Sequence, residues 1–320
     1  MHLNLKGAKR MNDLAVLSSD NYDAIAQMVG ITDDANTGSK VNTLNRLRLW
    51  HYPTMGQAEI NGKLKNVEVI DGGVFRLEVI EGSLSKYVFS KTISVRPFLQ
   101  RFMLKRYIPN KNPKPNEKKG EFQRTIMSDS LKKDLKDNTG RFNCGKPSGY
   151  IEDFQALPTN MQDLIRQVKR VRVLFGIVTM ENPMDESGKP MDEFETPFIW
   201  EIDNKDAFKS VGECMGTFVR HQRLPWSHAI TFTESTQHEM DNNSSYYTPV
   251  CKVDMNITYE QTIEDDATMS NFLDWVKNNN DYICKEWDAN NTKRQEEIPE
   301  EDMDVVEDFI DIELEEGDAK

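Results

Sequence analysis

The chain of 320 residues has little cysteine and no long apolar run. Its cysteines, Cys144, Cys214, Cys251 and Cys284, lie far apart without paired spacing, which favours reduced thiols over a disulfide framework. No run of roughly 18 apolar residues occurs, and the start of the chain lacks an uninterrupted apolar block. The sequence therefore predicts neither a membrane span nor a secretory signal, and we expect a cytoplasmic protein.

Motifs for common catalytic and cofactor chemistry are lacking as well. The sequence has no GxxxxGK[ST] phosphate loop and no GxGxxG dinucleotide fingerprint. Its five histidines follow no motif from which a catalytic triad could be named. We therefore expect a protein that is not an enzyme and that holds no cofactor and no metal.

One set of soft ligands could nevertheless be read as a zinc site. It consists of Cys214, His221, His228 and Cys251. These residues lack the recurrent ligand spacing of known zinc sites. Buried thiols are the simpler interpretation of Cys214 and Cys251.

One set of carboxylates could be read as a nuclease site. The segment WEIDNK places Glu201 and Asp203 on one face of a predicted strand, with Lys205 following. Alternating carboxylates beside a lysine are what a metal-dependent nuclease requires. A solvated strand edge that leads into a helix capped by Asn204 explains the same residues.

Acidic charge is concentrated at the end of the chain. The formal net charge is −13, and the segment from Glu296 to Lys320 holds thirteen Asp or Glu against one Lys. This −12 leaves the remaining residues nearly neutral. Like charges on a short segment repel and keep it out of a core, so residues 291–320 are predicted to be a disordered acidic tail.

The tail also carries apolar residues between its carboxylates. Val305, Val306, Phe309 and Ile310 are spaced as one side of a short helix, a pattern that suits docking into a basic groove. A solubility tail with no partner is the alternative. The residues expected to contact partner proteins are Asp304, Glu307, Asp308, Phe309, Ile310 and Asp311.

The first half of the chain predicts an arm followed by strands. Residues 1–55 are interpreted as an N-terminal arm with one short helix in SDNYDAIAQMVG. From Gly56, apolar and polar residues alternate through QAEINGKLKNVEVIDGGVFRLEVIEGSLSKYVFSKTISV, with turn residues at hairpin intervals, which predicts an antiparallel meander. RPFLQRFMLKRYI fits a helix or a strand, and we favour the strand.

The second half alternates helices and strands. A helix capped by Thr159 is expected, with Met161, Leu164, Ile165 and Val168 facing inward. Strands are predicted in VRVLFGIVTM, TPFIWEID, WSHAITFTES and SYYTPVCKVDM, with a helix after Asn204. A last helix should run through DATMSNFLDWVKNNNDYICKEW and bury Phe272, Val276, Ile283 and Trp287.

These elements predict an α+β fold. We expect residues 56–290 to form an antiparallel, OB-like β-barrel or sheet with inserted and C-terminal helices. A parallel, doubly wound fold is disfavoured because strands and helices do not alternate in the first half.

Positive charge is concentrated in one segment of the predicted sheet. Between Lys86 and Arg124 there are eleven Lys or Arg against two Glu, a local charge of +9, and aromatic residues lie between them. Cations that contact phosphates and rings that stack on bases are the parts of a single-strand-binding groove. The predicted nucleic-acid-binding residues are Arg46, Arg48, Trp50, Lys86, Tyr87, Lys91, Arg96, Arg101, Lys105, Arg106, Tyr107 and Arg124.

The aromatic residues of this region divide into two expected roles. Trp50, Tyr87 and Tyr107 are the better candidates for stacking on bases. On amphipathic strands, Phe98, Phe102 and Phe122 are expected in the core instead.

The layout resembles the single-stranded DNA-binding proteins of tailed bacteriophages. It shares with them a meander that could close as an OB-like barrel, a basic aromatic face, and the acidic tail EEDMDVVEDFIDIELEEGDAK. The resemblance implies DNA coating during replication, recombination or repair in the host cytoplasm. It also implies that residues 296–320 recruit replication or recombination proteins and compete with DNA. Some members bind zinc through one His and three Cys in close spacing, and this chain has no such cluster.

Two further interpretations stay open. In a virion structural or assembly protein, the basic segment and the acidic tail would be contacts between subunits. In a metal-dependent nuclease, Glu201 and Asp203 would hold the metal. The expected partners are single-stranded DNA and replication or recombination proteins, with no membrane, and self-association is left open.

Overall fold

The computed structural model describes residues 44–297, with gaps at 61–62, 82–83, 111–114, 116–118, 132–139, 148–150 and 241–244. The expected helix in residues 19–30 and residues 298–320 of the predicted tail lie outside the described residues. Residues 291–297 were also assigned to the disordered tail, and this was wrong, because they belong to the last helix, Ile263–Glu297. Within the described part, no helix has the length and apolarity that a membrane crossing requires.

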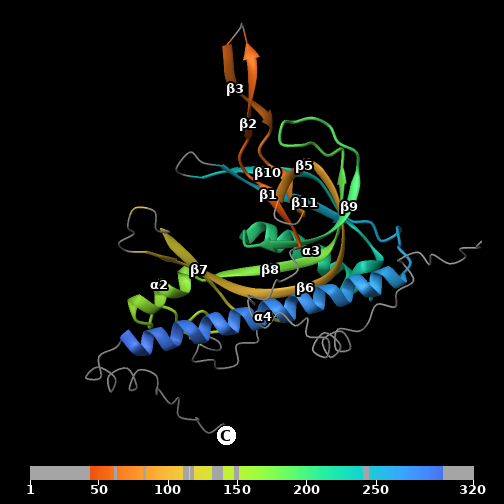
Figure 1. The fold of residues 1–320 in the computed structure, drawn as a ribbon. Coiled ribbons are helices and arrows are strands. Elements are labelled where there is room, and N and C mark those ends of the chain that lie inside the picture. Colours follow the sequence, from red (N-terminus) through yellow and green to blue (C-terminus); the bar gives the residue numbers. More distant parts are fainter. Residues whose placement is uncertain are drawn as a thin grey trace, which may run out of the picture. The chain divides into compact units, whose positions relative to one another are not determined.

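Nine strands form one large sheet, so the described chain is α+β and mostly antiparallel (Figure 1). The order is β11-β10-β6-β8-β9-β1-β4-β5, with β7 also paired to β6, and the β1–β9 pair is parallel. The strands are β1 (Asn45–Trp50), β4 (Val74–Glu81), β5 (Leu84–Ser90), β6 (Thr92–Pro109), β7 (Gly120–Arg124), β8 (Lys169–Glu181), β9 (Phe194–Ile202), β10 (Ile230–Glu239) and β11 (Ser245–Val253).

The remaining described elements are a separate hairpin and four helical segments. The hairpin pairs β2 (Thr54–Ile60) with β3 (Lys63–Ile70) and projects from the main sheet in Figure 1. The helical segments are α2 (Thr159–Gln167), α3 (Lys205–Arg220), the 3-10 turn η2 (Pro225–Ser227) and α4 (Ile263–Glu297).

The main sheet curls strongly around its core. β4 and β10 are five strand spacings apart in the sheet order, a separation of about 24 Å in a flat sheet. Nevertheless the ring centroids of Phe75 on β4 and Phe232 on β10 are only 5.4 Å apart. The ring of Trp200 on β9 contacts both, at 5.8 Å from Phe75 and 5.6 Å from Phe232. The sheet therefore bends until its two halves share one aromatic cluster.

A glycine permits the closest approach of the two halves. Gly73 has φ of +80°, and a Cβ there would lie 2.4 Å from the ring of Tyr247. Ser235 on β10 donates to the Gly73 carbonyl at 2.6 Å, and the Tyr247 N–H donates to Nδ1 of His51 at 3.0 Å. These contacts join the start of β4 to β10 and β11 without a strand pairing.

The two faces of the sheet are covered by different helices. The inner face packs Leu47, Phe75 and Phe198 against α3 residues such as Val211 and Phe218. The outer face packs Phe98, Met103, Val171, Val173, Phe175 and Ile199 against Phe272 and Val276 of α4. In Figure 1, α4 runs along β6 and β8 on the side opposite α3.

Most elements agree with the sequence predictions. The strand interpretation of RPFLQRFMLKRYI is confirmed by β6, and Asn204 caps α3 by accepting bonds from the N–H groups of Asp206 and Ala207. The four apolar residues predicted for the last helix are all buried on α4. Thr159 was wrong as a cap, because α2 begins there and Pro158 precedes it without a side-chain cap bond.

The structure corrects the expected architecture at three points. The barrel alternative was wrong, because no described strand pairing joins β5 to β11 and the sheet stays open. The meander is interrupted, because β2 and β3 pair with each other outside the main sheet. Residues 45–50, which were assigned to the arm, form β1 inside the main sheet, between β9 and β4.

Candidate nucleic-acid interface

A basic and aromatic surface lies on the outer face of β1, β4 and β5. On β1, the exposed Arg46 and Arg48 alternate with Leu47, which is buried against the inner core. Arg46 is paired with Ile199, whose side chain belongs to the outer cluster under α4. The two arginines therefore lie on the same face as α4.

Arg76 of β4 is the centre of this surface. Its guanidinium lies 3.6 Å from the ring centroid of Trp50 and 4.5 Å from that of Tyr87. Trp50 also packs edge-on against Tyr52, which is 66% exposed. We call Arg46, Arg48, Trp50, Arg76 and Tyr87 the platform.

Two arginines of the platform face each other across neighbouring strands. Arg48 on β1 is directly opposite Arg76 on β4. Like charges in directly opposed positions destabilise a sheet. Burial first, and the nearby charge of Arg48 in addition, lower the pKa of Arg76 from its ordinary value. A bound anion would remove this repulsion.

Two carboxylates lie near the platform, fewer than its three arginines, and Trp50 contributes one further donor. Glu78 lies opposite Arg46, and a Glu186 oxygen accepts a bond from the Tyr87 backbone N–H. The indole N–H of Trp50 is buried and has no acceptor among the described residues. The platform therefore keeps an excess of cations and one unused donor.

A second basic and aromatic patch lies on the paired ends of β6 and β7. Tyr107 and Phe122 face each other, with ring centroids 5.1 Å apart, and they are 41% and 53% exposed. The Lys105 ammonium lies 4.6 Å from the Phe122 centroid. We call Lys105, Tyr107, Phe122 and Arg124 the ribbon patch. It includes three of the predicted binding residues.

The two carboxylates of the nuclease interpretation lie in ion pairs. Glu201 is paired with Lys105 at 3.5 Å and with Arg124 at 3.0 Å, and Asp203 lies 3.7 Å from Lys169. Each of the two carboxylates is therefore already paired with at least one cation of the protein. No cluster of three or more ligand side chains suited to a metal occurs in the described part of the chain.

The four residues of the zinc interpretation make separate contacts in the structure. The Cys214 and Cys251 sulfurs lie 3.4 Å apart, and none of the four cysteines forms a disulfide. His228 instead stacks on Phe218 and contacts the Ile257 carbonyl through Nδ1. His221 contacts the Thr217 carbonyl of its own helix. The four residues do not converge on one point.

Arg96 has a structural role that its sequence context did not reveal. Its guanidinium forms two bonds to the Asp265 carboxylate, at 2.9 and 2.7 Å, and donates to the Trp226 carbonyl. Both side chains of the ion pair are largely buried. Arg96 therefore anchors the start of α4, and we leave it out of the interface.

The other predicted cations are scattered around the two patches. Lys91 pairs with Asp71 on the surface, and Arg106 donates to Gln123. Arg101 donates to the neighbouring Gln100 carbonyl. Lys86 is exposed on β5 beside Tyr87. Lys86 directly precedes Tyr87 and lies opposite Val79, so its side chain points to the other face of the sheet from the platform.

Sequence reasoning missed Arg76 and misassigned Phe122. Arg76 lies in a strand of mixed charge, and only its opposition to Arg48 reveals its role. Phe122 was expected in the core, but it lies on the short edge strand β7, where its side chain is exposed. The available signal was that Phe122 is the single large apolar residue of Gly120–Arg124, which gives this strand no apolar face to bury.

Comparisons with protein-family models, with curated proteins and with solved structures find no match to this chain.

Proposed function

We propose that the protein is a non-enzymatic single-stranded DNA-binding protein that uses the platform as its principal contact surface. The observation that carries this proposal is the placement of Arg76 between two aromatic rings and directly opposite Arg48. The arrangement costs stability as long as no anion is present. A phosphate backbone would neutralise the arginines while bases stack on the exposed ring surfaces.

The proposal includes an OB-like use of the sheet. OB-folds bind single strands on the face of a curved, mostly antiparallel sheet with cations and aromatic rings. The platform lies on such a face, and the ribbon patch adds two exposed rings beside Lys105 and Arg124, which share Glu201 as their acidic partner. A strand that contacts both patches would be held without reading its sequence, because every base has a ring face for stacking.

The proposal also assigns a role to the acidic tail. The −12 segment would compete with DNA for the cations of the platform and would recruit replication or recombination proteins. We place this activity in the cytoplasm, that of the host cell if the chain is encoded by a phage.

The proposal is tested by fluorescence-anisotropy titration of a labelled single strand of about 30 bases and its duplex, at several salt concentrations. Arg48→Gln with Arg76→Gln should weaken single-strand binding and reduce the log–log salt slope by about 1.4, because two phosphate contacts are lost at about 0.7 each. Trp50→Ala should cost about 1–3 kcal/mol of binding free energy through lost stacking.

A charge-matched control lies on the other side of the sheet. Lys205→Gln with Lys209→Gln removes two exposed cations from α3, which covers the inner face. This variant should bind DNA as the parent does. Equal losses in both double variants would mean that overall charge, and not the platform, attracts DNA. If the full chain does not bind the single strand at low salt, the proposal is wrong.

A further inference from the structure

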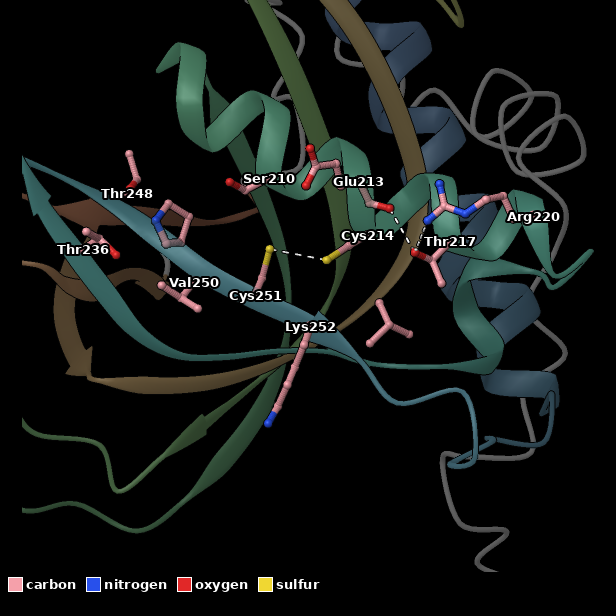
Figure 2. A pocket seen from close by; sticks show the side chains of 12 residues that line it. Ser210, Glu213, Cys214, Thr217, Arg220, Thr236, Thr248, Val250, Cys251 and Lys252 are labelled. Atoms are coloured by element: carbon pink, nitrogen blue, oxygen red, sulfur yellow. Dashed lines mark hydrogen bonds between the residues drawn. The ribbon is translucent and has the colours of Figure 1, made fainter.

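A groove lies between α3 and the edge strand β11. It encloses about 440 Å³ and is lined by α3 residues that share one helix face and by consecutive residues of β11 (Figure 2). The lining includes Ser210, Glu213, Cys214, Thr217 and Arg220 from α3. The lining residues from the sheet are Thr248 to Val253 of β11 and Thr236 of β10.

β11 has an open edge along this groove. It is the last strand in the sheet order, and no described strand pairs with its outer side. Tyr247 donates its N–H to His51 and not to β10, so this N–H points to the outer side. Antiparallel strands alternate the direction of their backbone groups. Pro249, Cys251 and Val253 therefore point their backbone groups to the same open edge.

Pro249 supports this assignment of the edge. Proline has no N–H for a ladder bond and is tolerated on the open side of an edge strand. It lies two residues after Tyr247 without a bulge in β11, so its missing N–H lies on the same outer side. On this side, the three carbonyls and the N–H groups of Cys251 and Val253 have no strand partner among the described residues. They form a template for one more strand.

The chemistry of the groove is suited to a strand with one apolar and one acidic face. Cys251 and Val253 pack towards the core under α3, and Val250 is 40% exposed. The cations Arg220 and Lys252 are both exposed and lie at the groove, with Glu213 as an acidic neighbour. In Figure 2, the Lys252 side chain points away from the paired thiols of Cys214 and Cys251.

The C-terminal segment of the chain has this pattern. From residue 310 to residue 315 it reads Ile-Asp-Ile-Glu-Leu-Glu, so apolar and acidic residues alternate strictly. In a strand, such alternation places Ile310, Ile312 and Leu314 on one face and three carboxylates on the other.

We propose that residues 310–315 of a second copy of this chain dock on the open edge of β11 as an added strand. The apolar face would pack against α3, Cys251 and Val253, and the carboxylates would point to the opposite face, where Lys252 lies. Reciprocal docking of two copies closes a symmetric dimer. The inference does not depend on nucleic-acid binding, and its test contains no DNA.

We assign the docked segment to a second copy because the linker after α4 is too short for easy docking within one chain. Asp265 in the first turn of α4 is held by Arg96, next to the β6–β10 pair. Glu297 is the other end of this helix, about 48 Å further along its axis. The residues between Glu297 and Ile310 span at most about 45 Å when fully extended. The chain's own segment would have to be stretched to its limit, whereas the segment of a second copy is not restricted.

The test measures self-association of the full chain by sedimentation velocity, with reductant to keep the thiols reduced. The parent should form a concentration-dependent dimer. A full chain with Asp311→Ile, Ile312→Leu, Glu313→Asp and Leu314→Glu keeps the composition and charge of the segment but loses its alternation. It should sediment as a monomer, and a labelled peptide of residues 308–317 should bind to it. The peptide with the rearranged order should bind about tenfold more weakly or worse.

A matched pair of variants on α3 locates the docking site. Thr217→Trp fills the groove and should abolish the dimer and the binding of the peptide. Val219→Trp, on the 77%-exposed side of the same helix, should leave both unchanged. Circular dichroism of both variants separates loss of docking from loss of fold.

Three outcomes would overturn the inference. Equal binding of both peptides would mean attraction by charge alone. No effect of Thr217→Trp would place the docking elsewhere. A parent that stays monomeric at all concentrations, while the peptide binds the rearranged chain, would mean that each chain docks its own segment.

Discussion

At the residue scale, similar basic residues in one segment have unlike roles. Arg76 is held between two rings on an open face, whereas Arg96 is held in a largely buried ion pair with Asp265. Charge counting along the chain treats the two residues alike. The two arginines differ in the side chains that neighbouring strands or helices place beside them, and these neighbours cannot be identified from the residue type alone.

The buried ion pair predicts a pH-dependent stability. Burial by itself raises the pKa of Asp265, but bonds from Arg96 and Thr262 outweigh burial and hold the pKa below its ordinary value. Such a carboxyl stabilises the fold above its unfolded pKa of about 3.9, and the contribution is lost as pH falls through the lower folded value. Asp265→Asn should lower the free energy of unfolding at pH 7 by about 3 kcal/mol.

Urea unfolding at pH 7 and pH 3 measures this effect. The difference between Asp265→Asn and the parent should shrink at pH 3, where the parent begins to lose the same interaction. Asp71→Asn is the control, because its ion pair with Lys91 is 63% exposed on both sides and should contribute less than about 1 kcal/mol. A difference for Asp265→Asn that stays constant with pH would contradict the role assigned to the carboxylate.

At the element scale, α3 is held on the inner face of the sheet by a close approach to β8. Arg172 of β8 is buried, packs over the rings of Phe102 and Phe208, and donates to Gln100. Burial lowers the pKa of Arg172 to about 10. A Cβ at Gly212 of α3 would lie 2.5 Å from Nη2 of Arg172. The glycine therefore determines how near the helix can lie.

Gly212→Ala is predicted to destabilise the fold by about 1–3 kcal/mol, because the Arg172 guanidinium would have to shift away from the rings of Phe102 and Phe208 and from Gln100. Gly216→Ala in the same helix is its control. There the nearest atom is 3.5 Å away, on the exposed Arg220, so the better helix propensity of alanine should stabilise the protein by up to about 1 kcal/mol. Thermal unfolding of both variants checks the pair, and a stable Gly212→Ala variant would disprove the steric limit.

Elements with a strong local signal were predicted well from sequence. Asn204 and the apolar period of α4 are such signals, since capping and helical spacing act within a few residues. The pairing of β2 with β3 apart from the main sheet was not predictable, because hairpin turns specify local pairing and not which sheet receives it.

At the scale of the whole molecule, charge asymmetry gives the most direct prediction. A chain that ends at Gln295 lacks the −12 segment and should bind single-stranded DNA roughly tenfold more tightly at low salt. The gain should fade as salt rises towards 1 M, where the screening length falls to about 3 Å. Anisotropy titration of the truncated and full chains checks this, and equal affinities at low salt would show that the tail does not compete.

The sequence by itself determined the order of most helices and strands, the concentration of cations between Lys86 and Arg124, and the acidic end of the chain. Those properties follow from periodicity, capping and composition, which are local. Only the tertiary structure decided that β1 joins β4, so that Arg48 meets Arg76, and that Arg96 turns inward to Asp265. Strand partners and burial depend on residues far apart in the chain, because a curled sheet is stabilised by contacts across its whole width.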